Sequence, residues 1–305
     1  MIAPSGEQIE IAQGDQRAVV VEVGGGLRAY SAGGRDVLDG YGADEMSSSG
    51  RGQVLIPWPN RVLDGRYEFD GRRHQLPIDD VEEQDAIHGL VRWDAWTIGE
   101  REPNRVVMEH VLHPQPGYPF SLALALEYVL SAEGLRVGVT ATNLGESSCP
   151  YGSGAHPYLT VGTPTVDSVI LRAPGRTVLR SDERGIPSGT ESVEGTDCDF
   201  RHPRDIGATR LDHAFTDLER DDEGLARVEL RNPDEERGLT LWVDESYRYL
   251  MLFTGDPLPD VDRRSLAVEP MTCPPDAFRS GQDLLRLDTG QSFTSAWGIR
   301  PSSGE

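Results

Sequence analysis

The sequence contains no lysine, and all 29 basic residues among its 305 are arginines. This absence excludes mechanisms that need a lysine amine, such as a Schiff base with a carbonyl substrate or the lysine of a phosphate-binding loop. The Gly-x-Ser-x-Gly pattern of serine hydrolases is also missing. Several common enzyme mechanisms are therefore excluded before any motif is considered.

Cysteine is scarce, and the three that occur are widely separated at Cys149, Cys198 and Cys273. Without a Cys-x-x-Cys pair, neither a zinc site nor a redox pair is predicted, and reduced thiols are expected. No run approaches the roughly eighteen apolar residues of a transmembrane helix. The first residues lack the basic and apolar regions of a signal peptide, so we expect a cytoplasmic location and no membrane partner.

Positive charge is outweighed by acidic residues, which give a formal net charge of −22. Such a chain repels nucleic acid and anionic lipid and has no basic stripe to overcome that repulsion. We therefore expect no nucleic-acid partner, and a neutral or cationic small substrate is easier to reconcile with the charge.

Helical patterns are nearly absent, while apolar residues alternate with polar ones in many short segments. The 34 glycines and 21 prolines separate these segments, which is typical of an all-β sandwich or barrel. We predict one domain over residues 1–305, a hairpin around Asp70–Gly71, and one helical turn after Pro275. Further strands are expected at 17–23, 105–112, 121–130, 135–143, 166–171, 225–230, 238–243, 248–254 and 292–299.

One acidic residue stands in an unusual setting within the stretch SLAVEPMTCPPDAF, residues 265–278. Glu269 ends an apolar strand and has no basic residue within four positions on either side. A carboxylate in such a place is solvated, paired or retained for catalysis, because its burial alone is costly. If Glu269 is buried, its partner must come from elsewhere in the chain.

Four other stretches place polar side chains among apolar, glycine or proline neighbours: IPWPNRVLDG, AIHGLVRW, YGSGAHPYL and TRLDHAFTDL. The residues of interest in them are Asn60 and Arg61, His88, His156, and Asp212. Arginine can grip a hydroxyl or carboxylate with fixed geometry, and a histidine held before a proline suits proton donation. Each residue also has a purely structural interpretation. Arg61 could be a surface arginine, and His88 a histidine of the core. His156 could be a structural histidine at a strand end, and Asp212 could cap a turn.

Taken together, these stretches resemble the aldose 1-epimerase (galactose mutarotase-like) family from about residue 20 to residue 300. The resemblance is carried, in order, by Asn60–Arg61 followed by GRYEFDGRRHQL, Ile87–His88–Gly89 with Trp93 and Trp96, His156–Pro157–Tyr158, Leu211–Asp212, and Glu269–Pro270 with Pro275–Asp276–Ala277. The segments IPWPNR, HGLVRW and AVEPMTCPPDAF further resemble those of a poorly characterised bacterial branch of this family. Some members of that branch are linked to unusual hexoses. Leu90 replaces the second glycine of the family's HGG-like element, which affects the expected shape of the pocket.

The resemblance implies a large antiparallel β-sandwich that acts on a small aldose as a monomer or homodimer. It implies no cofactor and no metal. By motif, Glu269 takes the position of the catalytic base and His156 that of the general acid. The positions that hold sugar hydroxyls or the ring oxygen fall on Arg61, His88 and Asp212, with Asn60 beside them.

In the expected mechanism, Glu269 and His156 lie on opposite sides of the sugar rather than in direct contact. Their opposite charges would lower the pKa of Glu269 and raise that of His156. Three alternatives remain open: an epimerase of phosphorylated or acidic sugars, which the net charge disfavours, a non-catalytic carbohydrate-binding protein, and a glycosidase using Asp212 and Glu269.

Overall fold

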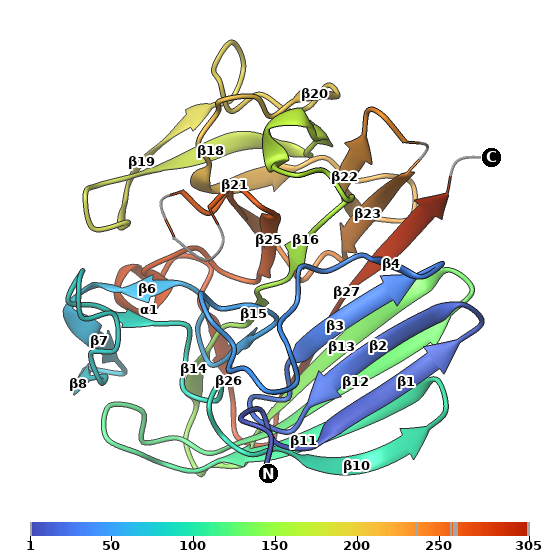
Figure 1. The fold of residues 1–305 in the computed structure, drawn as a ribbon. Helices are drawn as coiled ribbons and strands as arrows, with labels where there is room; N and C mark the ends of the chain where they lie inside the picture. The colour runs from blue at the N-terminus through green and yellow to red at the C-terminus, as the bar shows by residue number, and fades with distance from the viewer. Residues whose placement is uncertain (1, 236, 257, 259–261, 304–305) are drawn as a thin grey trace.

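The computed structural model describes residues 2–235, 237–256, 258 and 262–303, and most of the ordered segments are β-strands (Figure 1). All pairings between the named strands of these residues are antiparallel. The all-β prediction and the antiparallel sheets are confirmed.

The largest sheet within the described residues has nine strands. Its order is β10 (Thr97–Glu102), β11 (Arg105–Leu112), β12 (Leu122–Ser131), β13 (Gly134–Asn143), β27 (Ser292–Ser303), β23 (Arg237–Val243), β22 (Ala226–Asn232), β17 (Ile170–Arg172) and β20 (Arg204–Asp205).

An eight-stranded sheet forms the second large layer. It contains β19 (Pro187–Ser192), β18 (Gly175–Ser181), β21 (Asp212–Leu218), β24 (Tyr249–Phe253), β25 (Leu266–Met271), β15 (Gly154–Ala155) and β5 (Val54–Leu55), and β16 (Tyr158–Leu159) also pairs with β25. A four-stranded sheet lies against the nine-stranded one (Figure 1) and comprises β1 (Gln8–Gln13), β2 (Gln16–Val21), β3 (Leu27–Ala32) and β4 (Arg35–Asp36).

Smaller elements complete the described chain. Three strand pairs are β6 (Arg61–Val62) with β9 (Ala86–Ile87), β7 (Arg66–Phe69) with β8 (Arg72–Gln75), and β14 (Cys149–Tyr151) with β26 (Leu285–Leu287). The predicted helical turn after Pro275 is α1 (Ala277–Ser280), and the 3-10 turn η1 spans Leu63–Gly65. The expected strand at 166–171 is partly wrong, because Val166–Ser168 forms the 3-10 turn η2 and only β17 continues as a strand.

The core forms where the apolar faces of the sheets meet. In β12, alternate residues from Leu122 to Leu130 are buried, as the period-two pattern predicts. The same cluster takes Val268 from β25 and Ile9 from β1, so it joins all three large sheets. All three cysteines are buried free thiols.

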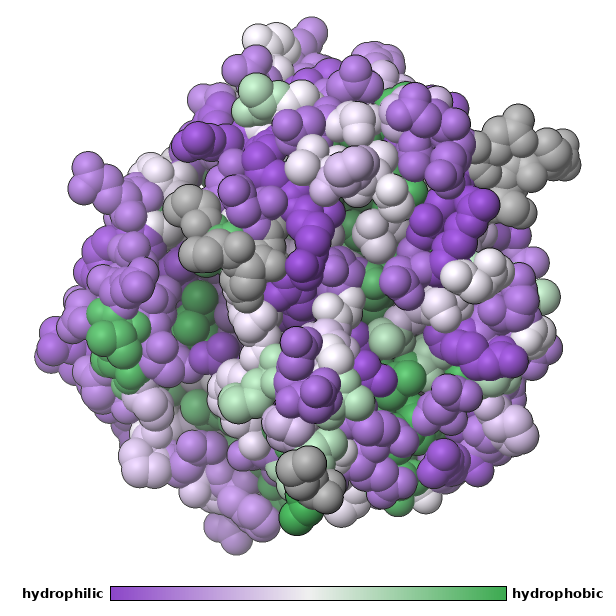
Figure 2. Space-filling model, in the orientation of Figure 1, coloured by the Kyte–Doolittle hydropathy of each residue, from purple (hydrophilic) through white to green (hydrophobic). Residues whose placement is uncertain are grey.

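Hydrophilic residues dominate the face shown in Figure 2, in keeping with the strongly acidic composition. Among the described residues, no helix has the length and apolar character needed to cross a bilayer.

Candidate active site

Strand β25 presents Glu269 on the side of the sheet that faces away from the main core. Leu266 and Val268 point into that core, while Ala267 and Met271 belong to two small clusters on the other face. Because successive side chains alternate, Glu269 shares this second face with Ala267. The sequence therefore places an acid on an apolar strand without placing it in the core.

Asp212 lies on the same face as Glu269. In the sheet register Asp212 stands opposite Phe253, which stands opposite Ala267, two residues before Glu269. Directly opposite residues of an antiparallel sheet share a face. Two carboxyl groups predicted from separate stretches are therefore brought to one surface by strand pairing.

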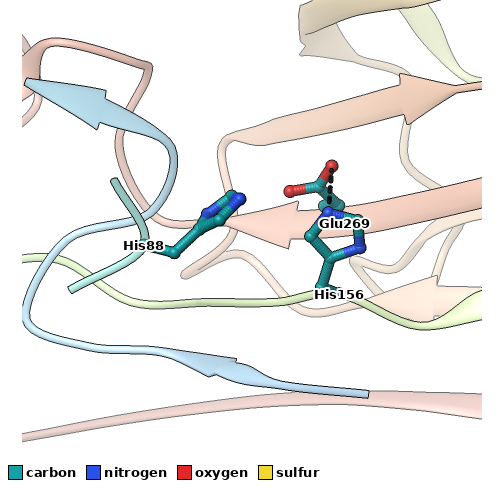
Figure 3. A group of neighbouring side chains, drawn as sticks. All are labelled: His88, His156 and Glu269. Carbon is teal, nitrogen blue, oxygen red and sulfur yellow. Dashed lines mark ion pairs between the residues drawn. The ribbon is translucent and has the colours of Figure 1, made fainter. Parts of the chain in front are cut away.

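His156 reaches Glu269 from the segment between β15 and β16 (Figure 3). Its Nε2 atom lies 3.4 Å from Oε1 of Glu269, and both side chains are buried. The expectation that the two groups do not touch is wrong for this structure. The physical reason is that β25 pairs with both β15 and β16, which bracket His156.

Burial shifts both groups of this pair toward their neutral forms. The low dielectric raises the pKa of Glu269 well above 4.5, and the negative charge of Asp212 adds to the rise. Burial lowers the pKa of His156 to about 3, assisted by the positive charges of Arg51 and Arg92. The predicted directions of both shifts are wrong, because desolvation outweighs the attraction between the partners.

His88 lies beside the pair and has its ring proton on the nitrogen that faces away from the backbone. Its Nδ1 atom accepts a hydrogen bond from the backbone N–H of Asn60 at 3.2 Å. Burial holds the pKa of His88 well below 6.5, so the ring is neutral and Nε2 carries the proton. His88 therefore offers a hydrogen-bond donor without bringing a charge.

The backbone fixes His88 in a conformation that few non-glycine residues adopt. Its φ is +62°, and its own N–H donates to the carbonyl oxygen of Asn60 at 3.0 Å. A methyl group added at Gly89 would lie 2.0 Å from the carbonyl oxygen of Ile56. Gly89 thus permits the close approach of a second backbone. Leu90 packs against the main core.

The group formed by His88, His156 and Glu269 has the composition of a zinc site. One ring nitrogen of each histidine and one carboxylate oxygen lie within 4.8 Å of one another, and Figure 3 shows the three side chains converging. A metal needs a free lone pair on each ligand. His88 uses the lone pair of Nδ1 for Asn60 and has a proton on Nε2, so in this tautomer it is a donor and not a ligand.

Arg61 and Asn60 sit at the start of β6, next to this group. The Nε atom of Arg61 donates to Asp80 at 3.0 Å, and its positive charge opposes the rise in the pKa of both Asp212 and Glu269. The side-chain oxygen of Asn60 accepts the backbone N–H of Arg61. Asn60 therefore shapes the turn that positions His88 and Arg61.

Asp212 is exposed, in contrast to the buried pair. Surrounding protein atoms nevertheless desolvate its carboxyl group and raise its pKa, while Arg61 and His213 oppose that rise. Since water reaches Asp212 and not Glu269, a ligand entering the site would meet Asp212 first.

Sequence reasoning missed two arginines that act on this site. Arg51 is buried and lies 3.6 Å from Asp39, and Arg92 pairs with Asp79 at 2.5 Å. Both charges oppose protonation of His156. Arg51 stands between two glycines, so the criterion that identified the other polar residues would also have found it.

A cavity of about 760 Å³ opens elsewhere, beside the ends of β3, β4 and β23. Its described lining includes Asp15, Arg35, Glu235 and Arg237 and contains no histidine. The two buried histidines and the buried carboxyl group lie instead in the group around Glu269.

The sequence matches a known family over most of its length. A family model described as aldose 1-epimerase matches residues 7–300. The chain belongs to the aldose 1-epimerase family. The family resemblance seen in the sequence is confirmed.

Relatives within this family include proteins whose activities are not established. The chain is 37% identical to the uncharacterised protein YihR of Escherichia coli over 288 residues, which cover 94% of this chain and 91% of that protein. It is 30% identical to the galactose mutarotase of Rattus norvegicus over 164 residues, covering 51% and 46% of the two chains. The crystal structure of a GalM/aldose epimerase homologue from C. elegans superposes with a TM-score of 0.86 at 17% identity, covering 98% of this chain and 99% of that one. This last match shows that the fold is shared.

Proposed function

We propose that this protein is an aldose 1-epimerase that interconverts the α and β anomers of a hexose or related aldose. The observation that carries the proposal is the buried contact of 3.4 Å between His156 and Glu269, with the Nε2–H donor of His88 beside it. A buried carboxyl–imidazole pair is costly for a protein that only binds sugar. Family membership and the name of the rat relative support the same activity.

Mutarotation needs one proton removed from the C1 hydroxyl and one delivered to the ring oxygen. With an ionised Glu269 and a protonated His156, the carboxylate takes the first proton and the imidazolium gives the second. Opening then leaves Glu269 protonated and His156 neutral, and reclosure on the other face of C1 reverses both transfers. General acid and base catalysis each contribute roughly 10²–10⁴-fold.

Burial favours the neutral form of both groups, so Glu269 is protonated and His156 is neutral before substrate binds. The pair has this same distribution of protons after ring opening. One proton transfer from Glu269 to Nε2 of His156 converts it to the ion pair that opens a ring. Both forms hold the same number of protons, so the pair can start the reaction without exchange with bulk water. In this mechanism His88 donates to a sugar oxygen, and Arg61 and Asp212 bind hydroxyls.

The test is Glu269→Gln, which removes the ionisable group and keeps the size of the side chain. Anomer exchange is measured by NMR at equilibrium on a panel of hexoses and pentoses. We expect the variant to lose at least about 10²-fold in rate. Glu229→Gln is a matched control, since Glu229 forms an exposed pair with Arg172. Exchange at the wild-type rate in Glu269→Gln would refute the mechanism.

An acidic aldose is the second candidate substrate, favoured by one observation. Arg51, Arg61 and Arg92 all exert positive charge on the buried site groups, although the whole chain is acidic. Each is paired with an aspartate, so a sugar carboxylate or phosphate would have to compete with that partner. Glucose, glucuronic acid and glucose 6-phosphate in the same exchange assay separate the two candidates.

A further inference from the structure

His156 is held from two directions by groups that the proposed chemistry does not use. Its ring stacks on Tyr158, with centroids 5.0 Å apart and planes 17° from parallel. The backbone of Gly50 lies against the ring edge that carries Nε2. We infer that Tyr158 and Gly50 are positioning residues, which fix the His156 ring so that Nε2 faces Glu269. This inference rests on the proposed function for its kinetic consequence.

Tyr158 is itself anchored, so it can serve as a rigid support. Its hydroxyl donates to the carbonyl oxygen of Ser49 at 2.9 Å, and its own carbonyl oxygen accepts the N–H of Asp39 at 2.9 Å. The guanidinium of Arg51 lies 5.1 Å from the centre of its ring. The buried tyrosine is thus held at its hydroxyl and at its backbone, which limits tilting of the ring against the stacked imidazole.

Position 50 requires a glycine for two reasons, its backbone conformation and the lack of space for a side chain. Its φ is +78°, and a methyl group built there would lie 2.6 Å from Cδ2 and 2.9 Å from Nε2 of His156. No side chain fits this space unless the imidazole moves. Because residue 50 has no side chain, its backbone can lie close to the Cδ2 and Nε2 atoms of His156.

The loop and the histidine segment form one unit. The N–H of Gly52 donates to the carbonyl oxygen of His156 at 2.9 Å, and the N–H of His156 donates to that of Gln53 at 3.0 Å. Together with the bond from Tyr158 to Ser49, these contacts tie residues 49–53 to the segment 156–158. A displacement of the loop is thus transmitted to the catalytic ring, where an error of about 1 Å costs on the order of 10²-fold in rate.

Gly50→Ala tests the close approach, and Gly14→Ala is its matched control. Gly14 also has a left-handed backbone, with φ of +59°, but a methyl group there meets nothing within 4 Å. Both substitutions place an alanine in the left-handed region, and only the first presses on His156. We expect kcat to fall about 10- to 100-fold in Gly50→Ala with KM changed less than threefold, and both constants to stay at the wild-type value in Gly14→Ala.

Tyr158→Leu and Tyr158→Phe test the stacking if Gly50→Ala does not fold. The readout is NMR of the His156 ring, whose proton shifts report the stacked tyrosine and need no substrate. We expect Tyr158→Leu to move these resonances and lower kcat, and Tyr158→Phe, which keeps the stacked ring but loses the hydrogen bond to Ser49, to move the resonances less and lower kcat less.

Unchanged His156 resonances in Tyr158→Leu would overturn the inference, as would equal kcat values in Gly50→Ala and Gly14→Ala. If the wild type accelerates no anomer exchange, the proposed function fails, while the NMR experiment still decides whether Tyr158 and Gly50 hold the ring.

Discussion

Replacing Glu269 by glutamine should change how the stability of the protein depends on pH. In the folded protein, burial keeps Glu269 protonated above pH 4.5 and keeps His156 neutral down to about pH 3. The pair therefore holds one proton from about pH 4.5 up to the raised pKa of Glu269. In the unfolded chain, with ordinary pKa values of 4.5 and 6.5, the pair also holds about one proton near pH 5.5, now on the imidazole, and the deviations of about half a proton at pH 6.5 and 4.5 have opposite signs and cancel. The pair's net contribution to stability is therefore the same at pH 6.5 and at pH 4.5.

Glu269→Gln removes this balance. The folded variant keeps His156 neutral, because burial and the charges of Arg51 and Arg92 remain. The unfolded variant protonates the same imidazole below pH 6.5 and so binds one more proton than the folded form. Because the folded pKa is lowered, stability is lost as pH falls, at about 1.4 kcal/mol per pH unit. Between pH 6.5 and 4.5 the variant should lose about 2.3 kcal/mol relative to the wild type, because the unfolded imidazole is half protonated at pH 6.5 and the full slope is reached only below it.

Urea unfolding at pH 6.5, 5.5 and 4.5 measures this difference. Subtracting the wild-type free energy of unfolding from that of the variant at each pH cancels the titration of all other groups. The exposed pair of Arg172 and Glu229 supplies the control Glu229→Gln, whose difference should stay nearly constant. If the difference for Glu269→Gln is the same at pH 6.5 and 4.5, His156 is not held neutral by the fold and the reasoning fails.

Three further substitutions test the neighbours of the pair. Asp212→Asn removes a charge that raises the pKa of Glu269, so the alkaline limb of the kcat–pH profile should move to lower pH. Arg61→Met should move that limb to higher pH and reduce kcat/KM about 10- to 100-fold, as expected for loss of a charged hydrogen bond to sugar. His88→Ala should reduce kcat/KM up to about tenfold, because a neutral donor is lost. An unmoved limb in both of the first two variants, or wild-type kcat/KM in the third, would contradict these assignments.

Many of the strands, and the residues that the fold brings together around Glu269, could be predicted because they depend on local patterns. Alternation fixes which residues of β12 are buried, and the Asp70–Gly71 turn fixes the hairpin of β7 and β8. The lone acid on an apolar strand marked Glu269, and polar residues among glycines and prolines marked His88 and His156. The segment 166–171 failed because its first residues lie in a turn that the alternation does not reveal.

The sequence by itself determined an antiparallel all-β chain without lysine chemistry, and it supplied two acids, two histidines, an arginine and an asparagine as candidates for one site. Only the tertiary structure decided that His156 touches Glu269, since that contact depends on β25 pairing with β15 and β16. It also decided the direction of both pKa shifts, because desolvation is a property of the packed surroundings and not of neighbours along the chain. The tautomer of His88 and the approach of Gly50 to His156 likewise arise from backbone segments far apart in sequence.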